Sequence, residues 1–170
     1  TRFHFFDNLD GATWSAALSS LDLKTTRFLV VSKSGGTGET LMQALSAVEA
    51  LKGAGGGKYL KHHFAVLTEP TDNPARRFAA EIGAPTLDHP LDIGGRYAVL
   101  TLVGALPALL FGLDPVKMRE GAESVWSHIL AGEPSAPAEG AALAIAAAGT
   151  GHGELVLMPY GDRFERFGAW

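Results

Sequence analysis

One nine-residue stretch of the chain concentrates groups that bind anions. Residues 32–40 read SKSGGTGET and hold four hydroxyls, three glycines and a lysine. Glycines let a backbone approach an anion closely, hydroxyls donate hydrogen bonds, and Lys33 adds a full positive charge. A helix that starts here would also present unpaired N–H groups and the positive end of its dipole. The stretch therefore predicts a site for a phosphate group, with hydroxyls and backbone supplied by Ser32, Ser34, Gly35, Gly36, Thr37 and Thr40.

Two common phosphate motifs do not fit this stretch. A P-loop needs its lysine after the glycines, whereas Lys33 precedes them. The dinucleotide fingerprint G-x-G-x-x-G needs a different glycine spacing. The alternative is a plain strand–turn–helix connection whose Ser and Thr residues only cap the helix, although capping needs one or two of them. Glu39 would repel a phosphate, so we expect it to have a structural role in the first helical turn.

A second cluster, DIGGRY at residues 92–97, also precedes an expected helix. Gly94 and Gly95 would let the backbone crowd a ligand. Arg96 could bind a phosphate or a developing oxyanion in a bidentate manner. The alternative is a tight turn with an exposed arginine. Two helix starts that each carry glycines and a cation favour a ligand-binding site over tight turns.

Strand and helix patterns alternate along the chain. The apolar run at residues 28–31 is typical of a buried parallel strand, and the apolar residues that follow recur at helical spacing. Strands are predicted at residues 3–6, 28–31, 63–67, 85–87 and 154–158. Helices are predicted from the cap Asp10 to about residue 21, and at residues 37–52, 74–83, 97–111, 115–130, 138–148 and from 162 onward.

These elements predict an α/β fold, a doubly wound three-layer αβα sandwich with a mainly parallel sheet. Ligands of such sheets bind at the carboxyl ends of the strands, which is where residues 32–40 fall. The 97–111 helix is apolar on nearly all sides and is expected to be buried, with a kink at Pro107. The glycines at residues 53–57 are expected to end a helix in a flexible turn. Glu69 and Asp72 could reach the edge of the site, but roles in a turn and a helix cap are favoured.

Composition excludes several classes of function. With 170 residues, 46% hydrophobic and 19% charged, the chain reads as one soluble globular domain. A net charge of -4 argues against nucleic acid as a partner. The chain contains no cysteine, which excludes disulfides and fits a reducing compartment. The longest apolar run, residues 98–111, is too short to span a membrane, so a cytoplasmic protein is expected.

The six histidines show no metal-ligand spacing, so no metal is expected. His62 and His63 are adjacent and are expected on opposite faces of a strand.

Three segments resemble the glucose-6-phosphate isomerase family of the bacterial type. SKSGGTGET (residues 32–40) resembles the family's phosphate loop. GGRYAVLTLVGALPALLFGLD (residues 94–114) resembles the segment with its active-site arginine. LMPYGDRFERFGAW (residues 157–170) resembles the entry to its second sugar isomerase domain.

The resemblance implies a first sugar isomerase domain at residues 1–158 and the start of a linker at residues 159–170. It implies interconversion of glucose 6-phosphate and fructose 6-phosphate through a cis-enediol(ate), without a cofactor, in a homodimer. By resemblance, the loop holds the phosphate, Lys33 lies beside the substrate, and Arg96 stabilises the enediolate. Gly94 and Gly95 would pass close to the sugar.

Some family features are absent from this chain. The family's catalytic glutamate lies in a segment like QLWAESLGK, and its ring-opening histidine and a second lysine follow further on. An upstream glycine-serine loop is also missing. We therefore expect a chain that is cut at both ends and has no proton-transferring base, although the family is an aldose-ketose isomerase. Two alternatives remain: a non-catalytic sugar-phosphate-binding sensor module, and, less favoured, a receiver-like or nucleotide-binding sandwich.

Overall fold

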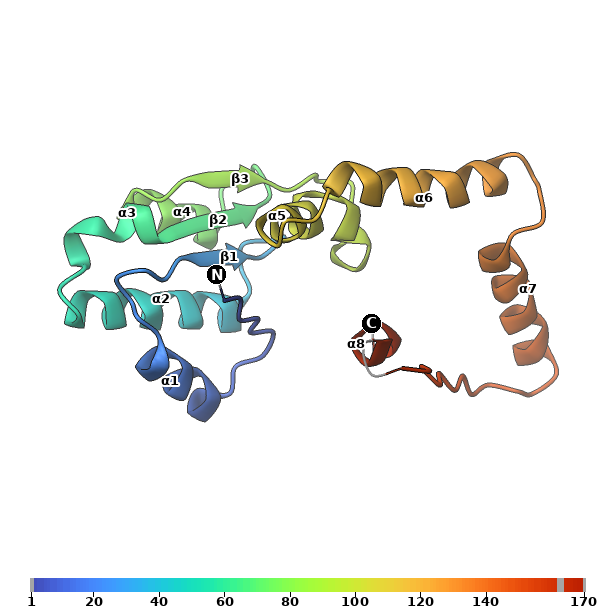
Figure 1. The fold of residues 1–170 in the computed structure, drawn as a ribbon, viewed down its shortest axis with the longest axis horizontal. Helices are drawn as coiled ribbons and strands as arrows, with labels where there is room; N and C mark the ends of the chain where they lie inside the picture. Colours follow the sequence, from blue (N-terminus) through green and yellow to red (C-terminus); the bar gives the residue numbers. More distant parts are fainter. Residues whose placement is uncertain (1, 162–163, 170) are drawn as a thin grey trace. The chain divides into compact units, whose positions relative to one another are not determined.

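The computed structural model describes residues 2–161 and 164–169 (Figure 1). The chain divides into two compact units, Thr1–Pro115 and Val116–Trp170. The first unit holds the sheet and both predicted ligand-binding segments. The predicted domain boundary near residue 158 remains a prediction.

The first unit is built on a three-stranded parallel sheet in the order β1-β2-β3 (Figure 1). The strands are β1 (Phe28–Val31), β2 (Phe64–Thr68) and β3 (Thr86–Asp88). In register, Val31 pairs with Leu67, and Thr68 pairs with Asp88. The three central strand predictions and the α/β class with a parallel sheet are confirmed. All three strands end at the same edge, because they are parallel.

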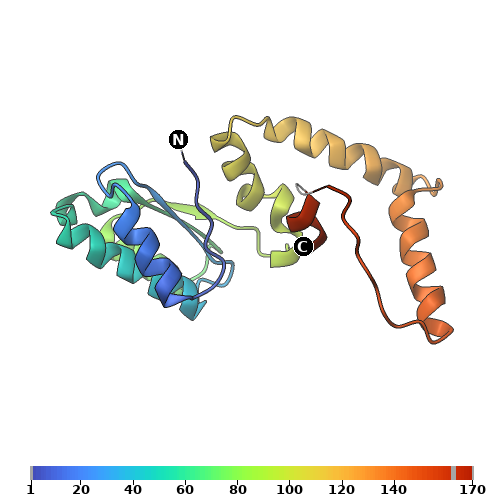
Figure 2. The same ribbon diagram turned by 60° about the horizontal axis from the view of Figure 1, so that its bottom comes forward.

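Three helices contribute buried side chains to the core on one face of this sheet. They are α1 (Gly11–Ser20), α2 (Gly38–Gly53) and α4 (Pro74–Ile82). Successive right-handed crossovers that advance in one direction, from β1 to β2 to β3, place α2 and α4 on the same face. Helix α1 lies beside α2 (Figure 2).

The core lies between these helices and the sheet. Alternation along the strands directs Val30, Phe64 and Val66 toward the helices. Phe64 stacks on Phe28 with ring centroids 5.1 Å apart and meets Phe78 of α4 edge-on at 5.8 Å. The remaining buried apolar members of this cluster are Trp14, Ala44, Ala47, Val48, Leu51, Leu60, Ala75 and Ala79.

The helix ends follow their sequence signals. Asp10 caps α1 as predicted, since its carboxylate accepts from the Ala12 amide at 3.1 Å. The predicted stop after α2 is also confirmed. Gly55 adopts φ +81° and the amide of Gly56 donates to the Leu51 carbonyl at 2.8 Å. The turn is therefore a hydrogen-bonded C-terminal cap with a defined conformation.

Two short helices between this turn and β2 were not predicted. They are η1 (Gly57–Tyr59) and α3 (Leu60–His63), and β2 begins one residue later than predicted. His62 and His63 therefore lie on a helix, and their expected placement on opposite faces of a strand is wrong. His63 is buried and His62 is exposed.

The predicted strand at residues 3–6 is wrong, because this segment pairs with no strand among the described residues. Its aromatic rings pack instead. Phe6 meets Trp14 edge-on with centroids 4.8 Å apart, and Phe3 stacks on Phe111 at 4.0 Å. A strand requires a ladder partner, which the local sequence does not specify.

The predicted single helix at residues 97–111 is also wrong. The structure has a 3-10 helix, η2 (Gly95–Leu100), and then α5 (Leu102–Leu110), which contains Pro107. Thr101 separates them, because its hydroxyl accepts from the Val103 amide at 3.2 Å and so caps α5. The expected burial is wrong as well, because most side chains of η2 and α5 are exposed or half-buried and only Ala98 and Ala108 are buried.

The second unit is helical, with α6 (Pro115–Leu130), α7 (Ala136–Gly149) and α8 (Glu165–Ala169). The predictions for α6 and α7 are confirmed. For the last predicted helix, residues 162, 163 and 170 lie outside the described residues. The strand predicted at residues 154–158 is wrong, since its side chains are exposed and no strand lies beside it in the described chain. No described helix is long and apolar enough to cross a membrane.

Candidate phosphate-binding site

The loop from Ser32 to Thr37 joins β1 to α2 at the carboxyl edge of the sheet. Ser32 is 5% exposed, and its amide extends the ladder by donating to the Leu67 carbonyl at 3.1 Å. The hydroxyls of Ser32 and Thr37 lie 2.8 Å apart and share a hydrogen bond. The two ends of the loop are thereby tied together.

Gly35 is the residue that the loop conformation requires to be glycine. It is buried, adopts φ +67°, and its carbonyl accepts from the Ala75 amide at 2.9 Å. A Cβ on Gly35 would overlap the side-chain amide of Asn73. The loop therefore packs directly on the start of α4.

Asn73 is a supporting residue that sequence reasoning missed. It is 4% exposed and caps α4, since its Oδ1 accepts from the Arg76 amide at 3.0 Å. Its Nδ2 donates to the carbonyls of Glu69 at 3.2 Å and Thr71 at 3.1 Å. An asparagine before a proline at the first helical position is a cap signal that could have identified it.

The first turn of α2 has unpaired donors that point to anion binding. Thr37, the N-cap residue, makes no side-chain capping bond. The Ser34 hydroxyl accepts from the Gly36 amide at 3.3 Å. Within the described chain, the amides of Gly38, Glu39 and Thr40 find no acceptor. The hydroxyls thus do not act as helix caps, and the helix dipole favours an anion at this point.

Glu39 lies in the first turn of α2, as expected. Thr40 lies on the same turn and is half-buried, whereas Ser34 and Gly36 are exposed at the loop surface. Both kinds of donor, hydroxyl and amide, are therefore present at the start of this helix.

Lys33 is held by a carboxylate. Its Nζ lies 3.4 Å from Oε1 of Glu69, with 33% of the lysine and 18% of the glutamate side chain exposed. The Lys33 carbonyl accepts from the Thr68 hydroxyl at 3.1 Å and from the Glu69 amide at 3.0 Å. The loop after β1 and the end of β2 are thus joined through both backbone and side chain.

The expected cap roles of Glu69 and Asp72 are wrong, because Asn73 caps α4. Glu69 instead lies at the loop beside Lys33. The carboxylate of Asp72 accepts from Arg77 at 2.8 Å. An asparagine at the N-cap position leaves both carboxylates free to pair with cations.

The second predicted cluster follows β3 at the same edge of the sheet. Gly94 precedes η2, and Gly95 and Arg96 begin it. Neither glycine has positive φ, and a Cβ on Gly95 would meet no atom within 4 Å. Packing within the described chain therefore does not explain this glycine. Arg96 is exposed and has no ion-pair partner among the described residues.

The structure brings Ser32, Lys33, Gly35 and Thr37 together in one loop. It adds no hydrogen bond or ion pair between this loop and Arg96 among the described residues. The described part of the chain also contains no group of three metal-ligating side chains.

Comparisons with known proteins identify the family of this chain. The family model for phosphoglucose isomerase matches residues 1–170. A glucose-6-phosphate isomerase of Carboxydothermus hydrogenoformans is 33% identical over 99% of this chain and 37% of its own length. One of Rubrobacter xylanophilus is 36% identical over 99% of this chain and 40% of its own length.

A crystal structure of a hypothetical protein from Thermus thermophilus superposes with a TM-score of 0.68 at 35% identity, covering 73% of this chain and 30% of that one. The chain spans about two fifths of the length of the relatives it matches. Because the family model matches this chain from residue 1 to residue 170, the chain belongs to the phosphoglucose isomerase family.

Proposed function

We propose that the loop at residues 32–40 binds the phosphate of a sugar phosphate. The observation that carries this proposal is the start of α2, where three amides have no acceptor in the described chain and Thr37 makes no capping bond. A dianionic phosphate ester satisfies several donors at once and interacts favourably with the helix dipole. The groups proposed to hold it are the backbone and hydroxyls of Ser32, Ser34, Gly35, Gly36, Thr37 and Thr40.

We further propose that the chain supplies this half of a glucose-6-phosphate isomerase site. The reaction moves a proton between C1 and C2 of the open-chain sugar through a cis-enediol(ate). Negative charge develops on the sugar oxygen, and an unpaired guanidinium is suited to stabilise it. Arg96 is assigned this role and Lys33 a place beside the substrate, with Gly94 and Gly95 close to the sugar.

A second candidate, binding without turnover, is favoured by the ion pairs near the loop. The base of the family is a glutamate, and such a carboxylate must be free to accept a proton. Glu69 is paired with Lys33, and Asp88 with Arg76. The isolated chain is therefore proposed to bind sugar phosphate and to lack the base. From the family resemblance we also propose a homodimer and a cytoplasmic location.

Calorimetric titration of the 170-residue chain with glucose 6-phosphate and with glucose tests the binding proposal. We expect heat of binding with the phosphorylated sugar only. Gly36→Asp would place a carboxylate beside the free amides and abolish binding. Gly36→Asn is the matched control, because it has the same shape without the charge, and the nearest atom to a Cβ there is 3.9 Å away. Equal binding of glucose, or equal loss in both variants, contradicts the proposal.

Turnover of fructose 6-phosphate by the same chain separates the two candidates. Absence of a general base costs on the order of 100- to 10,000-fold in rate. Turnover near that of a full-length relative would show that the chain contains its own base.

A further inference from the structure

A cavity lies at the amino end of the sheet, opposite the loop after β1. Its volume is about 410 Å³. Arg27 in its wall directly precedes β1, and His63 directly precedes β2. The cavity is formed by the α1–β1 connection, the end of α2, and η1 with α3; its lining residues are Leu23, Lys24, Arg27, Leu51, Ala54, Gly55, Gly56, Tyr59, His62 and His63. All of them belong to the first unit.

The lining of this cavity is basic. Four of the lining residues are Lys, Arg or His, and no lining residue carries a carboxylate. Neither Lys24 nor Arg27 has an ion-pair partner in the described parts of the chain. Nη1 of Arg27 donates to the Thr26 carbonyl at 3.0 Å and lies 3.4 Å from Nδ1 of His63, so Nε and Nη2 remain for a ligand. Two cations without counter-ions in one cavity favour an anion.

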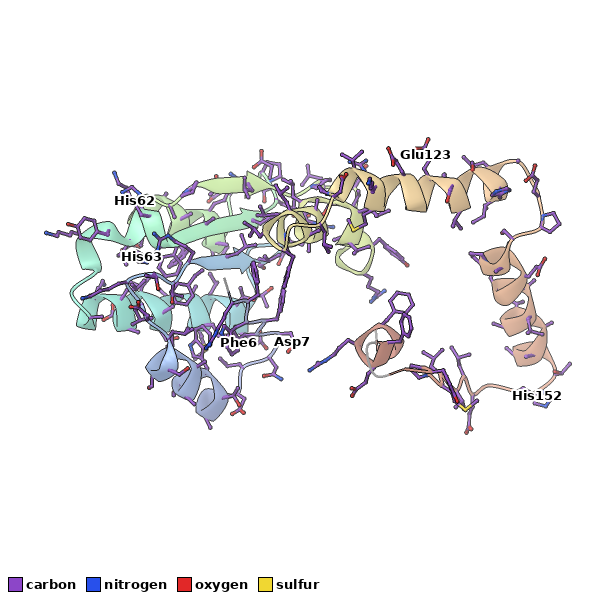
Figure 3. All side chains as sticks on the ribbon, viewed as in Figure 1. Phe6, Asp7, His62, His63, Glu123 and His152 are labelled. Atoms are coloured by element: carbon purple, nitrogen blue, oxygen red, sulfur yellow. The ribbon has the colours of Figure 1, made fainter. Side chains whose placement is uncertain are left out.

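The two histidines of α3 stand at this end of the sheet (Figure 3). His63 is 7% exposed, and its Nδ1 lies 2.8 Å from the Thr26 carbonyl. Since a carbonyl only accepts, Nδ1 carries the hydrogen and the ring orientation is fixed. His63 can therefore offer only Nε2 to a ligand.

The cavity is chemically different from the loop after β1. Its backbone amides are used within the turn, because Gly55 donates to Lys52 at 3.0 Å and Gly56 donates to Leu51 at 2.8 Å. An anion here would be bound by side chains instead of by a helix N-terminus. The remaining wall is apolar or aromatic, formed by Leu23, Leu51 and Tyr59.

We infer that this cavity binds a small organic anion. Lys24 and Arg27 contact the anionic group, and its apolar or ring-shaped body packs against Leu23 and Tyr59. A volume of about 410 Å³ lies within the range for sites of small-molecule ligands. The inference is independent of the sugar-phosphate proposal, since the two sites lie at opposite ends of the same strands.

Titration of the ¹⁵N-labelled chain with phenyl phosphate, followed by amide chemical shifts, tests this inference. We expect saturable shifts at Gly55, Gly56 and His62. Lys24→Gln and Arg27→Gln should each weaken binding by about ten-fold, because each removes a charged contact. Lys61→Gln is the matched control: it removes one exposed charge from α3 without touching the cavity, and it should leave the affinity unchanged.

Three results would overturn the inference. Shifts confined to Gly36 and Gly38 would place the probe at the loop after β1. An equal loss of affinity in Lys61→Gln would indicate that the probe is attracted only by the net charge of the chain. Inorganic phosphate binding as tightly as phenyl phosphate would remove the role of Leu23 and Tyr59. Lys24 is exposed on the surface, so Lys24→Gln is expected to fold. If Arg27→Gln fails to fold, Lys24→Gln still tests the inference.

Discussion

The side-chain amide of Asn73 occupies the space that a side chain on Gly35 would need. The loop after β1 and the cap of α4 are therefore packed against each other, although they lie far apart in the sequence. The same asparagine holds the carbonyls of Glu69 and Thr71. One buried residue thus sets the shape of two adjacent loops at the carboxyl edge of the sheet.

Gly35→Ala should destabilise the first unit. A Cβ would overlap Asn73, and φ +67° is unfavourable for alanine. We expect a loss of about 1–3 kcal/mol in the free energy of unfolding, measured by urea denaturation. Gly36→Ala, which has negative φ and no close contact, is the control and should change stability little. Equal stability of the two variants would show that the loop can move away from Asn73.

Glu69→Gln should strengthen binding of sugar phosphate. The substitution removes the carboxylate 3.4 Å from Lys33 and leaves that ammonium free for the ligand. We expect affinity to rise by up to about five-fold at low salt, because half-exposed ion pairs are worth little more. The gain should disappear near about 1 M salt.

Glu49→Gln is the matched control for this effect. It removes the same charge from the Glu49–Lys52 pair on the surface of α2, far along the helix from its start. If Glu49→Gln raises the affinity as much as Glu69→Gln does, net charge and not the Lys33 pair is responsible.

Arg96→Ala should mainly lower turnover when introduced into a full-length isomerase that contains this sequence. A cation near the developing oxyanion acts in the transition state, so kcat should fall on the order of 100- to 1,000-fold with little change in KM. Lys33→Ala should mainly raise KM, since Lys33 belongs to the loop that is proposed to bind the phosphate. The opposite pattern would reverse the two role assignments.

Leu51→Ala should destabilise the chain through its core. Leu51 is 1% exposed and belongs to the cluster between α2 and the sheet. We expect a loss of about 2–5 kcal/mol in the free energy of unfolding, because a cavity is left behind. Leu45→Ala on the same helix is the control: Leu45 is 55% exposed, so its loss should be small. If both variants lose a similar free energy of unfolding, the face of α2 that carries Leu45 is also buried in solution.

Asp10→Ala should lower stability in a pH-dependent way. The Thr13 hydroxyl, and after it the Ala12 amide, hold the pKa of Asp10 below its ordinary value of 3.8. A lowered folded pKa means that the stabilisation is fully present above about pH 4 and is lost as pH falls through the folded pKa. Urea unfolding at pH 7 and at pH 3 should show a larger deficit at pH 7. A deficit of the same size at both pH values would contradict this cause.

Much of the fold could be predicted because the signals are local. The apolar run at residues 28–31, the helical spacing after it, Asp10 before α1 and the glycines after α2 each specify their own element. The loop at residues 32–40 was recognisable for the same reason, since its hydroxyls and glycines are contiguous. The strands predicted at residues 3–6 and 154–158 failed, because a strand needs a partner that its own sequence does not contain.

The sequence by itself determined which residues form the loop proposed to bind phosphate, and which strand and helix hold it. Only the tertiary structure decided what supports that loop: Asn73 beneath Gly35, and Glu69 against Lys33. These contacts join residues that are more than thirty positions apart, and they exist because parallel pairing aligns the ends of β1 and β2. The basic cavity at the other end of the sheet has the same origin, since Arg27 and His63 meet only when the starts of those strands are paired.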